Sequence, residues 1–129
     1  MKKLTHFNDE PVRYVSTSQV TKGVNCDVYE FVNDTTKDLD IITIQKGCKT
    51  PLQEVIAGDK TYQMFLEGRV GLTILDTNKL THVYNFPEHE SDTIEVAIGE
   101  KMQWHATDDL VVAEICHPPY QDGRFRNIL

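Results

Sequence analysis

Residues 47–75 read GCKTPLQEVIAGDKTYQMFLEGRVGLTIL, and this stretch decides the fold that the sequence predicts. It contains two apolar, β-prone runs, Thr61–Leu66 and Val70–Leu75, which flank the short sequence Glu67-Gly68-Arg69. Strand-like runs on either side of a short turn that contains glycine are typical of antiparallel hairpins. Before them, Ala57-Gly58-Asp59-Lys60 is a further turn signal. We therefore expect the stretch to form one wall of a small β-barrel whose inward-facing residues line a pocket.

The rest of the chain repeats this pattern of short β-prone runs. No run of ten or more residues carries a helical apolar stripe, and about ten segments are strand-like, which favours an all-β sandwich or barrel. The expected strands outside the opening stretch are Pro11–Ser16, Cys26–Val32, Leu39–Lys46, Leu80–Phe86, Thr93–Ala97, Met102–Ala106 and Leu110–Cys116, with turns or loops at 16–23 and 33–38.

The length of the chain indicates one domain. Its 129 residues match the usual size of a single domain and suffice to bury a core without disulfides. Apolar residues make up 40% of the chain and charged residues 26%, as in globular proteins. We expect a single domain over 1–129, with a barrel core at about 24–120, an N-terminal arm at 1–16 and a C-terminal tail at 121–129.

Charge and cysteine content restrict the partners and the compartment. The formal net charge is −7 and no basic stripe is present, so we expect no nucleic-acid binding. No apolar run is long enough to span a membrane, and residues 1–10 have no apolar core of a signal peptide. The three cysteines, Cys26, Cys48 and Cys116, are an odd number without Cys-x-x-Cys spacing. A reduced, cytoplasmic location is the expectation.

Spacing within the opening stretch points to a known family. Five residues separate Gly47 from Gln53, six separate Thr61 from Gly68, and Pro51 precedes Gln53 by two positions. Phe65-Leu66-Glu67-Gly68 ends the run. These features resemble the first motif of the cupin superfamily, in which a glycine, His-x-His, a glutamate and a second glycine follow one another. The resemblance implies an all-β fold, the double-stranded β-helix (jelly-roll) cupin barrel of antiparallel strands.

Two later segments extend this resemblance to roughly residues 39–120. His105 matches the histidine of the second cupin motif, and Asp109 stands where that motif has asparagine. Cys116-His117-Pro118-Pro119-Tyr120 is similar to the Pro-Pro segment that often closes cupin barrels.

The metal-ligand positions implied by the resemblance are mostly altered. Gln53 and Val55 replace the two histidines of the first motif, Thr61 replaces its glutamate, and only His105 keeps its residue type. Amide and hydroxyl groups are poor ligands for zinc or iron. The chain is therefore similar to a small single-domain cupin with degenerate metal-binding motifs, in which His105 and Gln53 could still hold a divalent transition metal.

Alternation along the strands selects the candidate pocket residues. If Gln53 points inward, so does Val55, and if Thr61 points inward, so do Gln63 and Phe65. On the last long strand, either Val112, Glu114 and Cys116 or Val111, Ala113 and Ile115 share a face, and the second, uniformly apolar set suits packing between two sheets. The candidate ligand-binding residues are Gln53, Thr61, Gln63, Phe65, Trp104 and His105, with Glu114 or Tyr62 as further candidates.

Four functions fit this pattern. The first is a protein that binds a polar ligand, such as a sugar or a small acid, without the usual cupin metal. The second is a sugar isomerase-like or epimerase-like enzyme, with His105 as the catalytic acid or base and Tyr62 or Glu114 as its partner. The third is a divergent metal-dependent cupin, and the fourth is a structural dimer module. A homodimer is expected in any case, because pairing covers exposed strand edges.

Overall fold

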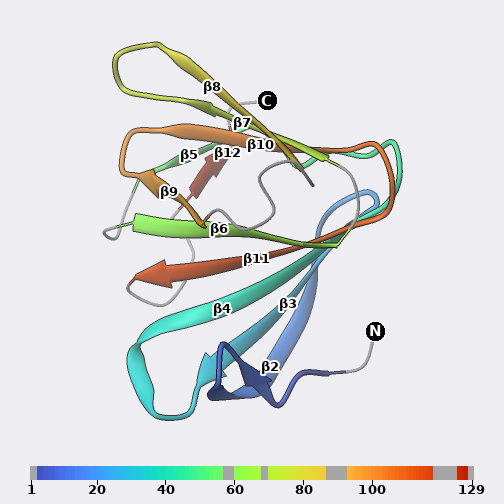
Figure 1. The fold of residues 1–129 in the computed structure, drawn as a ribbon, viewed down its shortest axis with the longest axis vertical. Helices are drawn as coiled ribbons and strands as arrows, with labels where there is room; N and C mark the ends of the chain where they lie inside the picture. The colour runs from blue at the N-terminus through green and yellow to red at the C-terminus, as the bar shows by residue number, and fades with distance from the viewer. Residues whose placement is uncertain (1–2, 57–59, 68–69, 87–92, 118–124, 128–129) are drawn as a thin grey trace.

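Two antiparallel β-sheets make up the computed structural model of this chain, which describes residues 3–56, 60–67, 70–86, 93–117 and 125–127. Figure 1 shows the five-stranded sheet above the curved seven-stranded sheet. The strand order is β1-β2-β3-β4-β11-β6-β9 in the larger sheet and β12-β5-β10-β7-β8 in the smaller. The strands are β1 (His6–Phe7), β2 (Glu10–Thr21), β3 (Val24–Phe31), β4 (Asp34–Ile44), β5 (Gln53–Val55), β6 (Lys60–Glu67), β7 (Val70–Leu75), β8 (Thr81–Phe86), β9 (Thr93–Ala97), β10 (Lys101–Ala106), β11 (Leu110–His117) and β12 (Phe125–Asn127).

The expected all-β architecture is confirmed, and the opening stretch forms β5, β6 and β7. However, β6 and β7 lie in different sheets, so they are not the two arms of one hairpin. Instead β7 pairs with β10 and β8, and β6 pairs with β11 and β9. The turn signals at 57–59 and 68–69 and the Pro118-Pro119 segment lie outside the described residues.

Two segments that were expected to be loops are strands. Residues 16–21 belong to β2, which pairs with β3 as far as Thr21, and Gly23 closes that hairpin with a φ of 76°. Glycine adopts this left-handed conformation without a steric penalty. Residues 34–38 belong to β4, because a tight turn reverses the chain after Phe31, which pairs with Asp34. Their polar sequences concealed both strands, since most of these residues are exposed or half-buried.

The predicted arm and tail also contribute strands. Residues 1–16 include β1 and the beginning of β2, and residues 121–129 include β12, which pairs with β5. In the part of the chain that the structure describes, there is no helix of the length and apolarity needed to cross a membrane.

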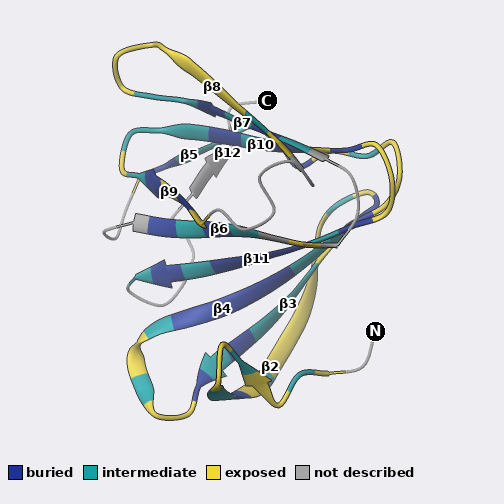
Figure 2. Cartoon of the chain, viewed as in Figure 1, coloured by how far each residue is buried: buried dark blue, intermediate teal, exposed yellow. Residues whose placement is uncertain are grey.

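The main core lies between the two sheets. Val24, Ile44 and Val112 of the larger sheet pack with Leu72, Ile74 and Trp104 of the smaller. A second apolar cluster, which includes Tyr29, Leu39 and Ala113, lies on the opposite face of the larger sheet, where Leu4 and Phe7 of the N-terminal segment pack against it. Figure 2 accordingly shows β4 and β11 buried through most of their length, whereas β2 and β8 are largely exposed.

The two faces of β11 settle the alternative that the sequence left open. Val112 belongs to the core between the sheets, and Glu114 and Cys116 share its face. Ala113 packs in the second cluster, with Val111 and Ile115 against it. The apolar set, which the sequence pattern suited to packing between the sheets, therefore lies on the other face. Because both faces of the larger sheet carry buried apolar side chains, an apolar face does not identify the barrel interior.

Candidate functional site

A cavity of about 120 Å³ lies inside the barrel between the two sheets. Its apolar wall includes Val24, Val28, Ile42, Met102 and Trp104, and its polar wall includes Thr50, Gln53, Asp40 and Glu114. Ser18, Val20 and Cys26 complete the lining. The cavity, whose rim includes the exposed residues Ser18 and Val20, therefore places two carboxyl groups, an amide and two hydroxyl groups against a largely apolar wall.

Strand register explains why polar side chains meet on this inner face. In one row across the larger sheet, Asp40 lies opposite Glu114, which lies opposite Gln63 on the next strand. In the neighbouring row, Asp38 lies opposite Cys116, which lies opposite Thr61. Residues that lie opposite one another in antiparallel strands bring their side chains together on one face of a sheet. These six side chains, the inner-face polar cluster, are all buried.

Gln63 is the centre of the hydrogen bonds within this cluster. It is fully buried, and its side-chain amide nitrogen donates to Glu114 Oε2 at 2.5 Å and to Thr61 Oγ1 at 3.2 Å. Its amide oxygen accepts a hydrogen bond from Trp104 Nε1 at 3.2 Å. Gln63 therefore connects the cluster on the larger sheet to Trp104 on the smaller sheet.

Trp104 is held in place by the segment that precedes β5. Thr50 N donates to the Trp104 carbonyl oxygen at 3.0 Å, and Trp104 N donates to Thr50 Oγ1 at 2.9 Å. Trp104 is 1% exposed, and both residues line the cavity. This pairing fixes the Trp104 backbone, and the hydrogen bond from Nε1 to Gln63 orients the indole ring at the cavity wall.

The interior around the cluster is electrostatically negative. Burial raises the pKa of the Cys116 thiol, and the nearby carboxylates of Glu114, Asp40 and Asp38 raise it further. The pKa of the Cys26 thiol is also raised, first by burial and then by Asp40 and Glu114. Both thiols consequently stay protonated at neutral pH, and they respond to a field that disfavours a further negative charge.

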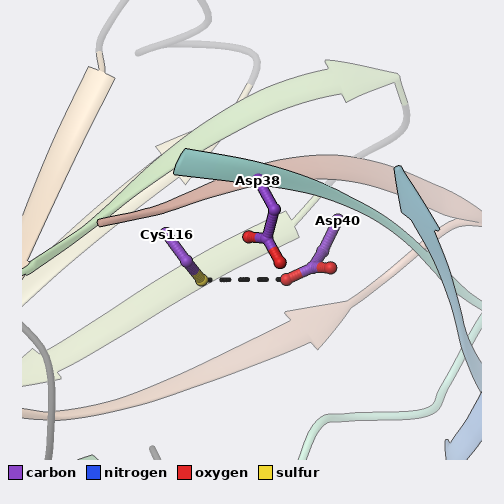
Figure 3. A group of neighbouring side chains, drawn as sticks. All are labelled: Asp38, Asp40 and Cys116. Carbon is purple, nitrogen blue, oxygen red and sulfur yellow. Dashed lines mark hydrogen bonds between the residues drawn. The ribbon is translucent and has the colours of Figure 1, made fainter. Parts of the chain in front are cut away.

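Three members of the cluster could hold a metal ion. Figure 3 shows Asp38, Asp40 and Cys116 pointing toward one another, and their ligand atoms lie within 4.8 Å of one another. The Cys116 sulfur lies 3.7 Å from Asp40 Oδ2 and 3.2 Å from Glu114 Oε1. Carboxylate oxygens suit a hard divalent cation, whereas a thiol must lose its proton before it coordinates well.

Most of the predicted ligand-binding residues are placed near this cavity. Gln53 and Trp104 line it. Thr61 and Gln63 are fully buried and belong to the cluster behind its polar wall. Phe65 lies on β6 opposite Val112, and its side chain is outside the described residues. Their roles in binding stay predictions.

His105 is placed differently from what the resemblance implied. It is exposed, while its strand neighbours Trp104 and Ala106 face the core, so Trp104 and not His105 reaches the cavity. Its proposed partners are also apart from it: Glu114 lies inside the barrel, and the Tyr62 ring packs edge-on against His117, with centroids 5.6 Å apart. The structure therefore lends no support to the predicted catalytic and metal roles of His105.

The residues at the family's metal positions do not fit a metal site. Gln53 offers a neutral amide, Val55 is part of the apolar core, and Thr61 donates or accepts only through a hydroxyl group. With His105 exposed, no imidazole from this set reaches them.

Sequence reasoning missed Asp38, Asp40 and Thr50. The signal for the two aspartates was present, because charged residues two positions apart in an apolar strand share one face. What the sequence could not indicate was that this face is the barrel interior, beside Glu114 and Cys116. Thr50 was read only as part of the segment before Pro51.

Comparison with known proteins supports the fold. No family model and no curated protein matches the sequence. Bacillus subtilis oxalate decarboxylase, a protein with Mn(II) centres, superposes with a TM-score of 0.70 at 14% identity over 84% of this chain and 29% of that one. A 7S globulin from Momordica charantia superposes with a TM-score of 0.67 at 15% identity over 90% of this chain and 35% of that one.

The chain thus spans about a third of the length of these structural neighbours. At such low identity the likeness concerns the fold alone. Both neighbours have the cupin fold, and the two curled antiparallel sheets described above match it. This chain therefore has the jelly-roll architecture of the cupin superfamily.

Proposed function

We propose that this cupin-fold chain binds a small polar molecule in the cavity between its two sheets. The observation that carries the proposal is the composition of the cavity wall, in which Gln53, Thr50 and two carboxyl groups converge on a mostly apolar pocket. Enclosed, mostly apolar pockets with a few convergent polar groups are the usual form of small-molecule sites.

The cavity volume restricts the ligand. A cavity of 150 Å³ in another protein holds benzene, so about 120 Å³ suits a ligand of about six non-hydrogen atoms. Of the ligand classes expected from the sequence, a polyol or sugar fragment that donates hydrogen bonds fits the carboxyl groups better than a small acid, which they would repel.

Metal-dependent chemistry is a second candidate, favoured by one observation. The ligand atoms of Asp38, Asp40 and Cys116 lie within 4.8 Å of one another. Two carboxylates and a deprotonated thiol could hold Mn²⁺ or a similar ion together with water. Elemental analysis of the purified protein separates the two candidates: about one metal per chain, lost in Asp38→Asn, would favour metal-dependent chemistry. Homodimerisation and a cytoplasmic location stay predictions.

A thermal-shift screen tests ligand binding directly. Small polyols, sugars, carboxylic acids and amines are added to the full chain, and each hit is titrated by Trp104 fluorescence, which reports from the cavity wall. Gln53→Leu should weaken binding of the hit, because it removes the amide but keeps the side-chain volume. Gln19→Leu, on the exposed part of β2, is the matched control. Screening that yields no hit, or a hit unaffected by Gln53→Leu, would contradict the proposal.

A further inference from the structure

We propose that the ligand of this cavity is a small organic cation, an alkylammonium-type molecule whose charged nitrogen binds between Asp40 and Glu114 while its carbon chain lies against the apolar wall. This inference rests on the proposed function and names the ligand class of the same site.

Charge in the cavity wall is the first argument. Among the described residues that line the cavity, Asp40 and Glu114 are the ionisable carboxyl groups, and none is lysine, arginine or histidine. The two lie opposite each other on adjacent strands and are 4% exposed each. Two carboxylates at facing positions of adjacent strands repel each other when both are ionised, and a cation placed between them relieves that repulsion.

The fixed orientation of the Glu114 carboxylate is the second argument. Glu114 accepts from Gln63 at one oxygen, and the Cys116 thiol lies 3.2 Å from the other. These contacts hold the carboxylate in one orientation at the cavity wall. An ammonium group has up to three N–H donors and forms charge-assisted hydrogen bonds with such oxygens.

The opposite wall favours an organic cation over a bare metal ion. Met102 and Trp104 of β10 face the carboxyl groups from the other sheet, and Val24, Val28 and Ile42 add branched aliphatic surface. A hydrated divalent ion gains nothing from this surface, whereas a carbon chain is stabilised by burial against it. The indole ring can also attract a cation through its π face.

Three probes of equal chain length test the proposal: n-pentylammonium, 1-pentanol and pentanoate. Each is titrated into the full chain and followed by the fluorescence of Trp104, the single tryptophan of the sequence, and by calorimetry. The ammonium should bind about tenfold or more tightly than the alcohol, as expected for hydrogen bonds to a charged group, and pentanoate should not bind.

Charge-neutral variants identify the groups responsible. Glu114→Gln should reduce the preference for the ammonium over the alcohol about tenfold, because it removes one charge and keeps the side-chain size. Asp40→Asn should do the same and provides a second test if Glu114→Gln does not fold, as judged by circular dichroism. Glu95→Gln, at an exposed position on β9, is the matched control and should leave the preference unchanged.

The outcomes separate this inference from the proposed function. Binding of 1-pentanol or pentanoate as tightly as n-pentylammonium would overturn the cationic ligand but leave a small-molecule site. Stoichiometric binding of Mn²⁺ or Zn²⁺ that blocks the ammonium probe would assign the carboxyl groups to a metal and overturn the organic cation. If no probe binds and the wider screen yields no hit, the proposed function fails as well.

Discussion

Replacing Gln63 with leucine tests whether the inner-face polar cluster stabilises the barrel. The substitution keeps the side-chain volume approximately but removes three hydrogen bonds, to Thr61, Glu114 and Trp104. Neutral hydrogen bonds contribute about 1 kcal/mol each and bonds to charged groups about 1.5–3 kcal/mol, and their partners would remain buried. Leucine recovers part of this through apolar burial, so the free energy of unfolding should fall by about 3 kcal/mol.

Urea denaturation followed by Trp104 fluorescence measures this change. The same transition followed by circular dichroism shows whether unfolding is two-state. Gln19→Leu is the matched control at an exposed position and should change stability by no more than about 0.5 kcal/mol. A loss below about 1 kcal/mol in Gln63→Leu would refute the reasoning, since buried partners left without Gln63 cost at least that much.

Three further predictions concern the glycine turn, acid stability and the thiols. Gly23→Ala should lower the thermal midpoint more than Gly47→Ala. Both glycines have positive φ, but a Cβ at Gly23 would lie 2.5 Å from Cys48 Sγ, whereas nothing lies within 4 Å of a Cβ at Gly47. Cys48→Ala should therefore partly rescue the Gly23→Ala variant. Hydrogen bonds from His82 and the backbone of Leu80 lower the pKa of Asp76 below 3.8. The ionised Asp76 therefore stabilises the folded state fully above that pH, and this stabilisation is lost as the pH falls through the folded-state pKa. Asp76→Asn should weaken the acid dependence of the free energy of unfolding below pH 3.8, and an unchanged acid profile would contradict this. Burial and Glu114 raise the pKa of the Cys116 thiol, so this thiol should resist iodoacetamide in the native state. It should react faster in Glu114→Gln, as measured by mass spectrometry. Equal reaction rates would argue against the electrostatic effect of Glu114.

Much of the fold followed from local pattern. The alternation and turn chemistry of residues 61–75 predicted strands whose limits agree closely with β6 and β7. Their assignment to separate sheets did not follow, because pairing depends on contacts with β10 and β11, which are distant in sequence. A turn signal between two strands therefore did not indicate that the two strands pair with each other.

The candidate site was predictable only in part. Gln53, Trp104 and the Thr61–Gln63 pair were identified because alternation places them on defined faces. His105 was favoured over Trp104 through the family resemblance, yet the one-residue difference in position carries it to the exposed face. A shift of one residue along a strand moves a side chain to the opposite face of the sheet. The spacing of a family motif therefore locates a site only where it matches residue by residue.

By itself, the sequence determined an antiparallel all-β chain, its approximate strands and which residues share a face along each strand. The tertiary structure alone decided which face is the interior. Both faces of the larger sheet carry buried apolar side chains, one against the smaller sheet and the other in the second apolar cluster, so apolar pattern cannot distinguish them. It also brought Asp38 and Asp40 beside Cys116 and Glu114, because long-range register between β4 and β11 is set by packing of the whole barrel and not by local propensity.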